Sequence, residues 1–292
     1  MPALERLRRG SAGDLIWLGA WLLLTGPVLA GIGYAAAASV GAVGPGASSA
    51  GIERIERVLA ESATWRGLGL TLWVAALATT LATAGAVLVA ATFRGAGGLD
   101  RVARGLAVLP LPVPHLVAGA LGLWVLGQSG GVARILAALG AVRMPAEMPA
   151  LVYDERGIGL ALTMAWKEFA FLVVVATVLL ASQARELEAA ARTLGAGPLQ
   201  TFFRITWPIL WRGLLPAVIA VFVFVAGSYE AAALLAPSDP LVLPLLMADR
   251  AADPDLARRG DAYVISLLLL GIAAVAVAAH EWTRARWEPL DS

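Results

Sequence analysis

Cysteine and asparagine are absent from this chain of 292 residues, and lysine occurs once, as Lys167. Without cysteine there is no disulfide framework and no thiolate chemistry. Charged residues make up only 15% of the chain, whereas a soluble globular domain has roughly 25%. The net charge of +1 argues against a nucleic-acid partner. The chain is instead 59% hydrophobic, with a mean hydropathy of +0.78, which indicates an integral membrane protein.

Two kinds of chemical motif are missing as well. The phosphate-binding pattern G-x-x-x-x-G-K-[ST] does not occur, and the single lysine follows Ala165-Trp166, so we do not expect this chain to hydrolyse ATP. Its two histidines, His115 and His280, are far apart in sequence and have no cysteine beside them. We therefore predict no metal site, no catalytic residue and no cofactor bound by this chain itself.

Six apolar stretches reach the length of roughly 20 residues that a membrane-spanning helix needs. Lipid offers no hydrogen bonds to the backbone, and stretches this long do not fit barrel strands, so we expect helices. The sequence therefore predicts an all-α integral membrane protein forming a single transmembrane domain over residues 1–292. The predicted spans are 15–38, 68–93, 106–126, 158–181, 214–236 and 262–279.

The arginines near the span ends give a small bias in orientation. If the N-terminus lies inside, twelve arginines fall on the inner side and nine on the outer side, and the inner ones sit in shorter segments. Basic residues are enriched on the cytoplasmic side of membrane proteins. We therefore expect both termini in the cytoplasm.

Proline marks an irregular place near the third span. The run LPLPVPH, residues 109–115, contains Pro110, Pro112 and Pro114, which remove three backbone donors. Two interpretations stay open. The span begins with a distorted turn buried inside the bundle, or its helix begins later, near His115.

Charges inside the predicted spans are the candidate polar sites. Lys167 and Glu168 lie in the fourth span, Glu230 in the fifth, and His115 beside the prolines. Such groups are costly in lipid and usually face a cavity or a partner. One hypothesis pairs Lys167 with Glu230. The other places Glu168 or Glu230 along a translocation path that favours a cationic substrate, with His115 either a packing residue or a gate.

Two segments on the expected outer side also have a pattern. Ile52, Ile55 and Leu59 share one helical face, which predicts a short interfacial helix. Residues 237–261 hold five aspartates among three arginines. For both segments a solvated loop is favoured over any specific role; the specific role considered for the acidic segment is to receive an external protein.

The segment between the fourth and fifth spans is longer than a connector needs. Leu187, Ala190, Ala191 and Leu194 fall on one face of a short amphipathic helix. Glycines at positions 195 and 197 can end that helix, and Pro198 suits the first turn of a second one. Leu199, Phe202 and Phe203 form its apolar face, and Pro208 marks the turn into the fifth span. Such a surface predicts either a docking site for a soluble protein or a helix lying on lipid.

This segment, EAAARTLGAGPLQTFFRITWPIL at residues 188–210, resembles the cytoplasmic EAA loop of permease subunits of type I ABC importers. The family pattern is Glu-Ala-Ala, three residues, Gly, nine residues and Ile-x-Leu-Pro; here Gly195 precedes Ile205-Thr206-Trp207-Pro208 by that spacing. The triplet in register is Ala189-Ala190-Ala191, so Glu188 stands one place early, and Glu188 or Glu186 would supply the acidic contact. The loop residues that the resemblance selects are Glu186, Glu188, Ala189, Ala190, Ala191, Gly195, Phe202, Ile205 and Pro208.

The resemblance extends to residues 109–123, 153–183 and 227–246, which look like the polyamine, ferric iron, thiamine and sulfate branch of these permeases. It implies a permease subunit that forms half of a translocation pathway, with the loop (about 182–208) docked on an ATPase dimer that binds ATP and Mg. It also implies a second permease, related or identical, an external substrate-binding protein, and a place in the inner membrane of a bacterial cell. The substrate stays open. A secondary transporter or channel, or an anchoring protein, is the alternative.

Overall fold

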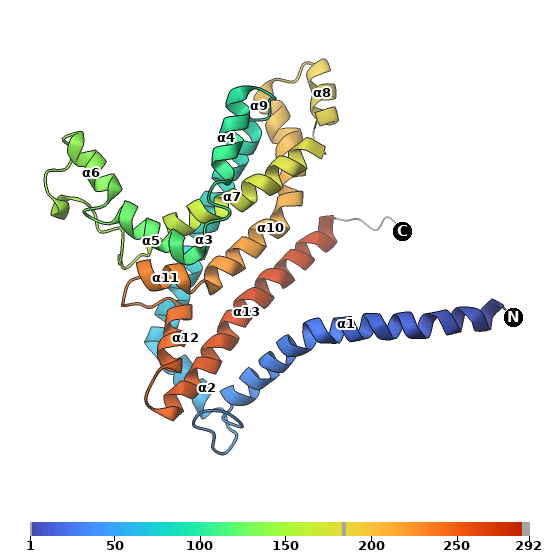
Figure 1. Cartoon of the computed structure of the whole chain (residues 1–292), viewed down its shortest axis with the longest axis vertical. Coiled ribbons are helices and arrows are strands. Elements are labelled where there is room, and N and C mark those ends of the chain that lie inside the picture. The colour runs from blue at the N-terminus through green and yellow to red at the C-terminus, as the bar shows by residue number, and fades with distance from the viewer. Residues whose placement is uncertain (1, 183–184, 288–292) are drawn as a thin grey trace. The chain divides into compact units, whose positions relative to one another are not determined.

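The computed structural model describes the backbone of residues 2–182 and 185–287, and the side chains of residues 16–181 and 186–285. Within these ranges every regular element is a helix, so the predicted all-α fold is confirmed. Six of the described helical segments are long and apolar enough to cross a membrane, as the sequence predicts. Figure 1 labels the larger elements. They are α1 (Pro2–Ser39), α2 (Glu53–Ala60), α3 (Ser62–Thr92), α4 (Gly98–Val108), α5 (His115–Leu126), α6 (Gly131–Ala138), η1 (Pro145–Glu147), α7 (Ile158–Ser182), α8 (Arg185–Thr193), α9 (Pro198–Thr201), η2 (Phe202–Thr206), α10 (Trp207–Gly227), α11 (Glu230–Leu235), α12 (Leu243–Ala251) and α13 (Leu256–Trp287).

The chain forms two compact units. Unit 1 consists of Met1–Glu61 and Met247–Leu268, and unit 2 consists of Ser62–Leu246 and Leu269–Ser292. That the two units together make one permease domain stays a prediction.

The core of unit 2 is built on the packing of α3 against α7 (Figure 1). Ala75, Ala78, Ala82 and Ala86 recur at helical spacing along α3, and each is 1% exposed or less. Small side chains let two helices in a membrane approach closely, so that van der Waals attraction acts along the whole length of the contact. The alanine-rich composition of the chain is therefore used here for helix packing.

The third span begins at His115, so the second of the two interpretations is correct and the predicted start at residue 106 is wrong. α4 ends at Val108, the prolines occupy a turn, and Pro114 is the residue that precedes α5. Leu111 N donates to Val108 O at 3.0 Å, and Val113 N donates to Pro110 O at 3.1 Å. The prolines thus occupy turn positions where no helical donor is needed.

The fifth span starts earlier than predicted and ends earlier as well. The helical path runs from Pro198 to Gly227, because α9 continues through the π-helix η2 into α10. Trp207 N donates to Phe202 O, five residues back, and this wide turn accommodates Pro208 in the first turn of α10. No turn forms at Pro208, which lies in α10 directly after the π-helix, within a continuous helix. The chain then breaks at Ser228, before α11.

Unit 1 joins α1, α2 and the beginning of α13 through buried charge. The predicted helix at residues 52–62 is present as α2, but its buried side chains are Arg54 and Val58, whereas Ile52 is 60% exposed. Arg54 donates to the carbonyls of Ala38 and Gly46. Asp261 is 1% exposed and receives Arg57 Nη2 at 2.7 Å. Since Asp261 is buried, it is not part of an exposed acidic surface for an external protein.

Candidate functional site

The loop after α7 has the predicted order of helix, glycine bend and helix. Gly195, with φ +86°, adopts the left-handed conformation that glycine accepts without strain. Gly195 N donates to Arg192 O, and Ala196 N donates to Ala191 O, both at 3.0 Å. These bonds satisfy the last carbonyls of α8 and fix the direction in which the chain leaves it.

The apolar side chains of this loop are exposed. Leu187, Leu194, Leu199 and Phe203 are each more than half exposed, and Leu194 reaches 88%. Phe202 instead packs against the core of unit 2, with its ring 6.4 Å from the ring of Trp207. The loop is thus held to the bundle at one side and presents apolar surface at the other.

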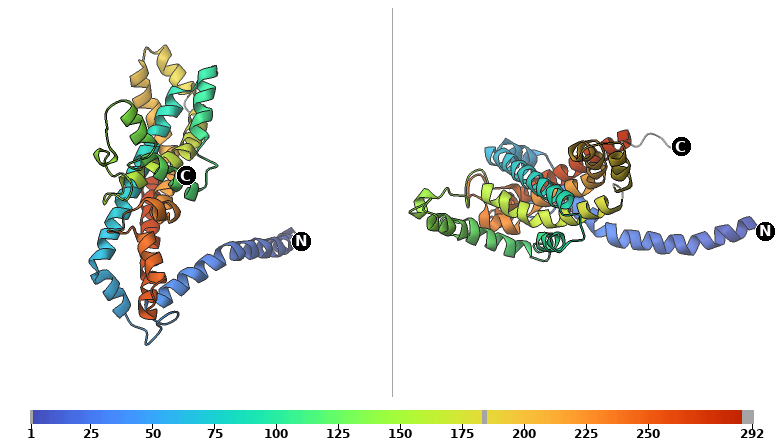
Figure 2. Two further views of the ribbon diagram at one scale, coloured as in Figure 1. Left: turned by 60° about the vertical axis from the view of Figure 1, so that its left-hand side comes forward. Right: turned by 90° about the horizontal axis from the view of Figure 1, so that it is seen from above.

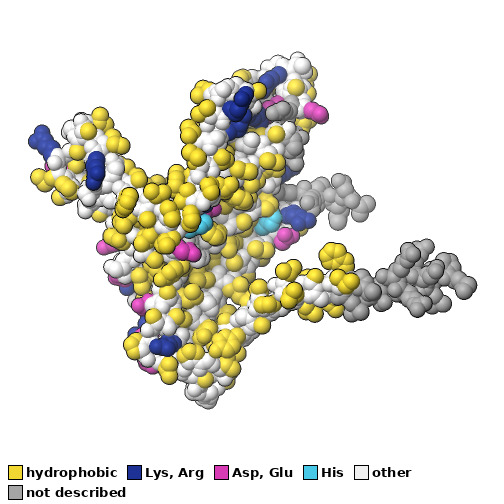
Figure 3. Space-filling model, viewed as in Figure 1, with side chains coloured by type: hydrophobic (Ala, Val, Ile, Leu, Met, Phe, Trp, Pro, Cys, Tyr) yellow, Lys and Arg dark blue, Asp and Glu magenta, His cyan; other side chains and the backbone are white. Residues whose placement is uncertain are grey.

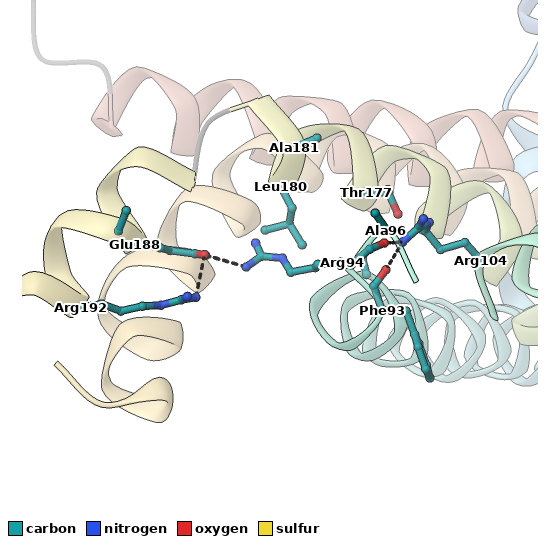
Figure 4. Close-up of a pocket in the computed structure, with 12 residues that line it drawn as sticks. Phe93, Arg94, Ala96, Arg104, Thr177, Leu180, Ala181, Glu188 and Arg192 are labelled. Carbon is teal, nitrogen blue, oxygen red and sulfur yellow. Dashed lines mark hydrogen bonds and ion pairs between the residues drawn. The ribbon is translucent and has the colours of Figure 1, made fainter. Parts of the chain in front are cut away.

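Glu188 is the side chain that holds α8 to the bundle (Figure 4). It is 4% exposed, and both of its carboxylate oxygens accept hydrogen bonds from Arg94 Nη1, at 2.9 and 2.8 Å. Thr206 Oγ1 donates to Oε1 at 2.5 Å, and Arg192 Nη2 lies 3.7 Å from Oε2. One carboxylate therefore joins α8 to η2 and to the end of α3.

Burial by itself would raise the pKa of Glu188, because it disfavours the charged form. The hydrogen bonds from Thr206 and Arg94 act in the opposite direction, and with the nearby charge of Arg192 they hold the pKa of Glu188 below its usual 4.5. Glu188 is therefore a carboxylate in its described surroundings at neutral pH.

The structure distinguishes Glu186 from Glu188, the two residues that the sequence offered for the acidic contact of the loop. Glu188 faces inward, whereas Glu186 and Ala189 are exposed. The position that carries glutamate in the resembled pattern is thus an exposed alanine, and Glu186 is the exposed acid of the pair. Sequence reasoning missed Arg94 and Thr206 as partners of Glu188, because Arg94 is 94 residues away in sequence and no spacing connects the two.

The predicted pair between Lys167 and Glu230 is not formed in the described part of the chain. Lys167 Nζ instead donates to Leu111 O at 3.4 Å, and Glu168 Oε1 lies 2.9 Å from Nε2 of His115. Glu230, at the start of α11, is exposed. Two consecutive residues of α7 thus hold the proline-rich turn. The prolines explain why Lys167 binds here. Leu111 O lies in a turn where no helical N–H reaches it, so it needs another hydrogen-bond donor.

His115 also packs against an aromatic side chain, in addition to its contact with Glu168. Its ring centroid lies 4.7 Å from that of Phe224 on α10, so the residue joins α5, α7 and α10. The packing role considered for His115 is observed, and Glu168 has a structural partner. Whether either lines a translocation path stays a prediction.

Six described helices long and apolar enough to cross a membrane are typical of a multi-pass membrane protein, and the helices after α7 present exposed apolar side chains. A family model for the inner membrane component of binding-protein-dependent transport systems matches residues 82–288. The chain belongs to this family.

Relatives of known name agree with that assignment. The molybdenum transport system permease protein ModB of Mycobacterium tuberculosis is 30% identical over 188 residues, which cover 63% of this chain and 66% of that protein, just under two thirds of its length. ModB of Escherichia coli K12 is 27% identical over 233 residues, covering 75% and 92%. A probable sulfate transport system permease protein of Nephroselmis olivacea is 27% identical over 61% of this chain and 59% of its own length.

The fold is also similar to solved structures. A chain from the crystal structure of a bacterial alginate ABC transporter, in complex with an alginate-bound periplasmic protein, superposes with a TM-score of 0.76. The match covers 97% of this chain and 96% of that one at 17% identity, so it shows a shared fold.

Proposed function

We propose that this chain is the transmembrane permease subunit of an ATP-driven ABC importer, and that it forms half of the translocation pathway. The observation that carries the proposal is the loop α8–α9, which exposes Leu194 and Leu199 while Glu188 holds it to the bundle. Membership of the transport family supports the proposal. Hydrolysis of ATP, with its Mg, belongs to a separate ATPase dimer in this scheme.

The loop would act as the mechanical connection to that ATPase. A short helix fixed at its buried side transmits a displacement, whereas a flexible connector absorbs it. Arg94 and Thr206 hold Glu188 from two different elements, so movement of α8 would be carried to the end of α3 and the start of the fifth span. This scheme places the loop and both termini in the cytoplasm.

A complete pathway would need a second permease, either a related chain or another copy, and an external substrate-binding protein. The first span, Ile16–Ser39, supports the second permease, because none of its apolar window is buried within its own compact unit. Such a surface has to be covered by lipid or by another membrane protein.

For the substrate we propose a small tetrahedral oxyanion. Support comes from the named relatives, which transport molybdenum and sulfate. The maltose permease MalF of Escherichia coli K12 is also 30% identical over 48% of this chain, so a sugar is the comparison substrate in any transport assay.

Gly195→Pro tests the coupling role. Proline cannot adopt φ +86° and lacks the N–H that bonds Arg192 O, so the bend would be lost. In proteoliposomes that contain both permeases and the ATPase, we expect substrate-stimulated ATP hydrolysis to fall at least about tenfold, the equivalent of roughly 1.4 kcal/mol.

Gly197→Pro is the matched control, because Gly197 already has φ −72°, which proline accepts, and its added Cβ meets nothing within 4 Å. This variant should keep wild-type coupling. If the ATPase never associates with the wild-type chain, or if both proline variants behave alike, the loop is not a coupling element and a secondary transporter becomes the better reading.

A further inference from the structure

We propose that α6 lies flat in the headgroup region of the bilayer, on the side where α5 ends, with its apolar face in contact with lipid. The helix α6 (Gly131–Ala138) is separated from α5 by residues 127–130. Figure 1 shows it beyond the end of α5, apart from the other helices of unit 2. The third candidate span runs through α6 to Ala138, so composition by itself would make α6 part of the membrane crossing.

The turn after α5 shows instead that the crossing ends there. Gly127 has ψ 153°, which is outside the helical range, and its carbonyl oxygen accepts a hydrogen bond from Gly130 N at 2.8 Å. A Cβ on Gly130 would overlap the carbonyl oxygen of Trp124, so the backbone makes a close approach that only glycine permits. Because this reverse turn interrupts the helix, α6 does not extend α5.

The segment that contains α6 is ordered and closed on itself. We call residues 127–148 the α6 hairpin. Gln128 Nε2 donates to Met148 O at 2.9 Å, which joins the two ends of the hairpin, and Met148 is buried. Arg134 Nε donates to Ser129 O at 3.2 Å and holds the first turn of α6 to the preceding loop. These contacts fix which side of α6 faces outward.

The outward side of α6 is apolar. Val132, Ile135, Leu136 and Leu139 follow one another at the spacing of a single helical face. Within this face Ile135 is 63% exposed and Leu139 is 76% exposed. Arg134 lies toward the opposite side of the helix. A short helix with an apolar face and a basic residue opposite is typical of helices that lie in the membrane interface.

The surface of the third span continues onto α6. Trp124, in the last turn of α5, is 76% exposed, and tryptophan is enriched where spans meet the headgroups. Trp124 and Arg134 line the same hollow of about 740 Å³. With eight residues, α6 is only about 12 Å long, so it stays close to the end of the span. The lipid that surrounds α5 is therefore the neighbour within reach of the apolar face of α6.

The charge of the α6 hairpin also favours the bilayer. Its charged residues are Arg134, Arg143 and one acid, Glu147, which accepts a hydrogen bond from Arg143 N at 2.7 Å. Both arginines are exposed. Figure 3 shows hydrophobic and basic side chains together on this hairpin. A net positive charge beside an apolar face complements the phosphate layer above the acyl chains.

Single cysteines test this position, because the natural chain contains none. The full-length variants Ile135→Cys and Leu139→Cys carry a nitroxide on the apolar face. Ala137→Cys is the matched control, since Ala137 is exposed and half a helical turn away from that face. Each variant is reconstituted alone into bilayers of phosphatidylethanolamine and phosphatidylglycerol. Electron paramagnetic resonance then compares the collisions of the label with oxygen, which enters lipid, and with a water-soluble nickel chelate.

We expect the labels at positions 135 and 139 to lie about 5–10 Å below the phosphates, the depth at which interfacial helices bury their apolar face. The label at position 137 should stay at or above the phosphates, shallower by about 10 Å, the diameter of a helix. Residues 135 and 139 repeat the measurement independently, and both side chains are exposed, so neither variant removes a packing contact of the core.

Three other outcomes would each overturn the proposal. If the nickel chelate reaches all three labels equally, the hairpin is a solvated loop that is free for a soluble partner. If neither reagent reaches positions 135 and 139, a second copy of the chain covers the face. If all three labels are equally deep, α6 is part of the crossing. Because no ATPase is present and no transport is measured, the result is independent of the proposed importer function.

Discussion

At the scale of single residues, Glu188 shows how one carboxylate organises a surface loop. Its partners come from the residues that follow α3, from η2 and from its own helix. A buried carboxylate is stable only when such donors replace the water it has lost. Glu188 therefore stabilises the position of α8, while the exposed Glu186, two residues earlier, leaves the outer face free for a partner.

Glu188→Gln is expected to lower the free energy of unfolding by about 1–3 kcal/mol, because the charged hydrogen bonds with Arg94 weaken. The depressed pKa gives this contribution a pH dependence. It is fully present above pH 4.5, the ordinary value, and is lost as the pH falls through the lower pKa of the folded state.

The measurement is thermal unfolding in detergent between pH 7 and the acid limit of the protein. Glu186→Gln is the control, and as an exposed change it should shift stability by less than about 0.5 kcal/mol. Equal effects of the two substitutions at neutral pH would contradict the role of Glu188.

At the scale of elements, two features give α3 its place in unit 2. Its alanine face packs against α7, and Thr71 fixes its N-terminal half. Thr71 Oγ1 donates to Gly67 O at 2.7 Å and accepts a hydrogen bond from Leu243 N at 2.8 Å, which ties α3 to the start of α12. The second contact satisfies one of the orphan donors at the N-terminus of α12.

Ala82→Leu is expected to destabilise unit 2 by about 1–3 kcal/mol, because the larger side chain has no space between α3 and α7. Ala82 is 1% exposed. Ala84→Leu, on the exposed side of the same helix, is the matched control and should be nearly neutral. Denaturation of both variants in detergent checks the difference, and equal stability of the two would show that this face is not tightly packed.

At the scale of the whole molecule, the spans differ in how much of their surface the chain covers. Half of the apolar window of the second and fourth spans is buried, whereas none of the first is. The loop helices lie beside the connection between α3 and α4 in both views of unit 2 (Figure 2).

A photoreactive benzoylphenylalanine in place of Leu23 tests the proposed assembly with a second permease. Leu23 is 77% exposed on α1. We expect illumination of membranes to yield an adduct with the mass of two permease subunits, since a second permease would cover this helix. Adducts with lipid alone, when the second permease is present, would count against this contact.

Unit 1 illustrates the same dependence on long-range pairing. The Asp261 hydrogen bond raises the pKa of Arg57 above its usual range, an effect that burial partly opposes and the Asp261 charge reinforces. Asp261 stands in a segment that reads from its sequence as an exposed acidic loop, but it is buried against α2. The composition of this segment could not show whether Asp261 is exposed in a loop or buried in an ion pair.

The sequence by itself determined the all-helical fold, the number of spans and the bend at Gly195. Lipid leaves a backbone of apolar residues no alternative to the helix, and a glycine followed by Gly197-Pro198 favours a left-handed turn and a new helix. Only the tertiary structure decided that Glu188 turns inward, that Lys167 and Glu168 hold the proline turn, and that the fifth span begins through a π-helix. For Glu188, Lys167 and Glu168 the physical reason is that their contacts join residues up to 94 positions apart. Their partners are set by how the helices pack, and local spacing carries no information about that.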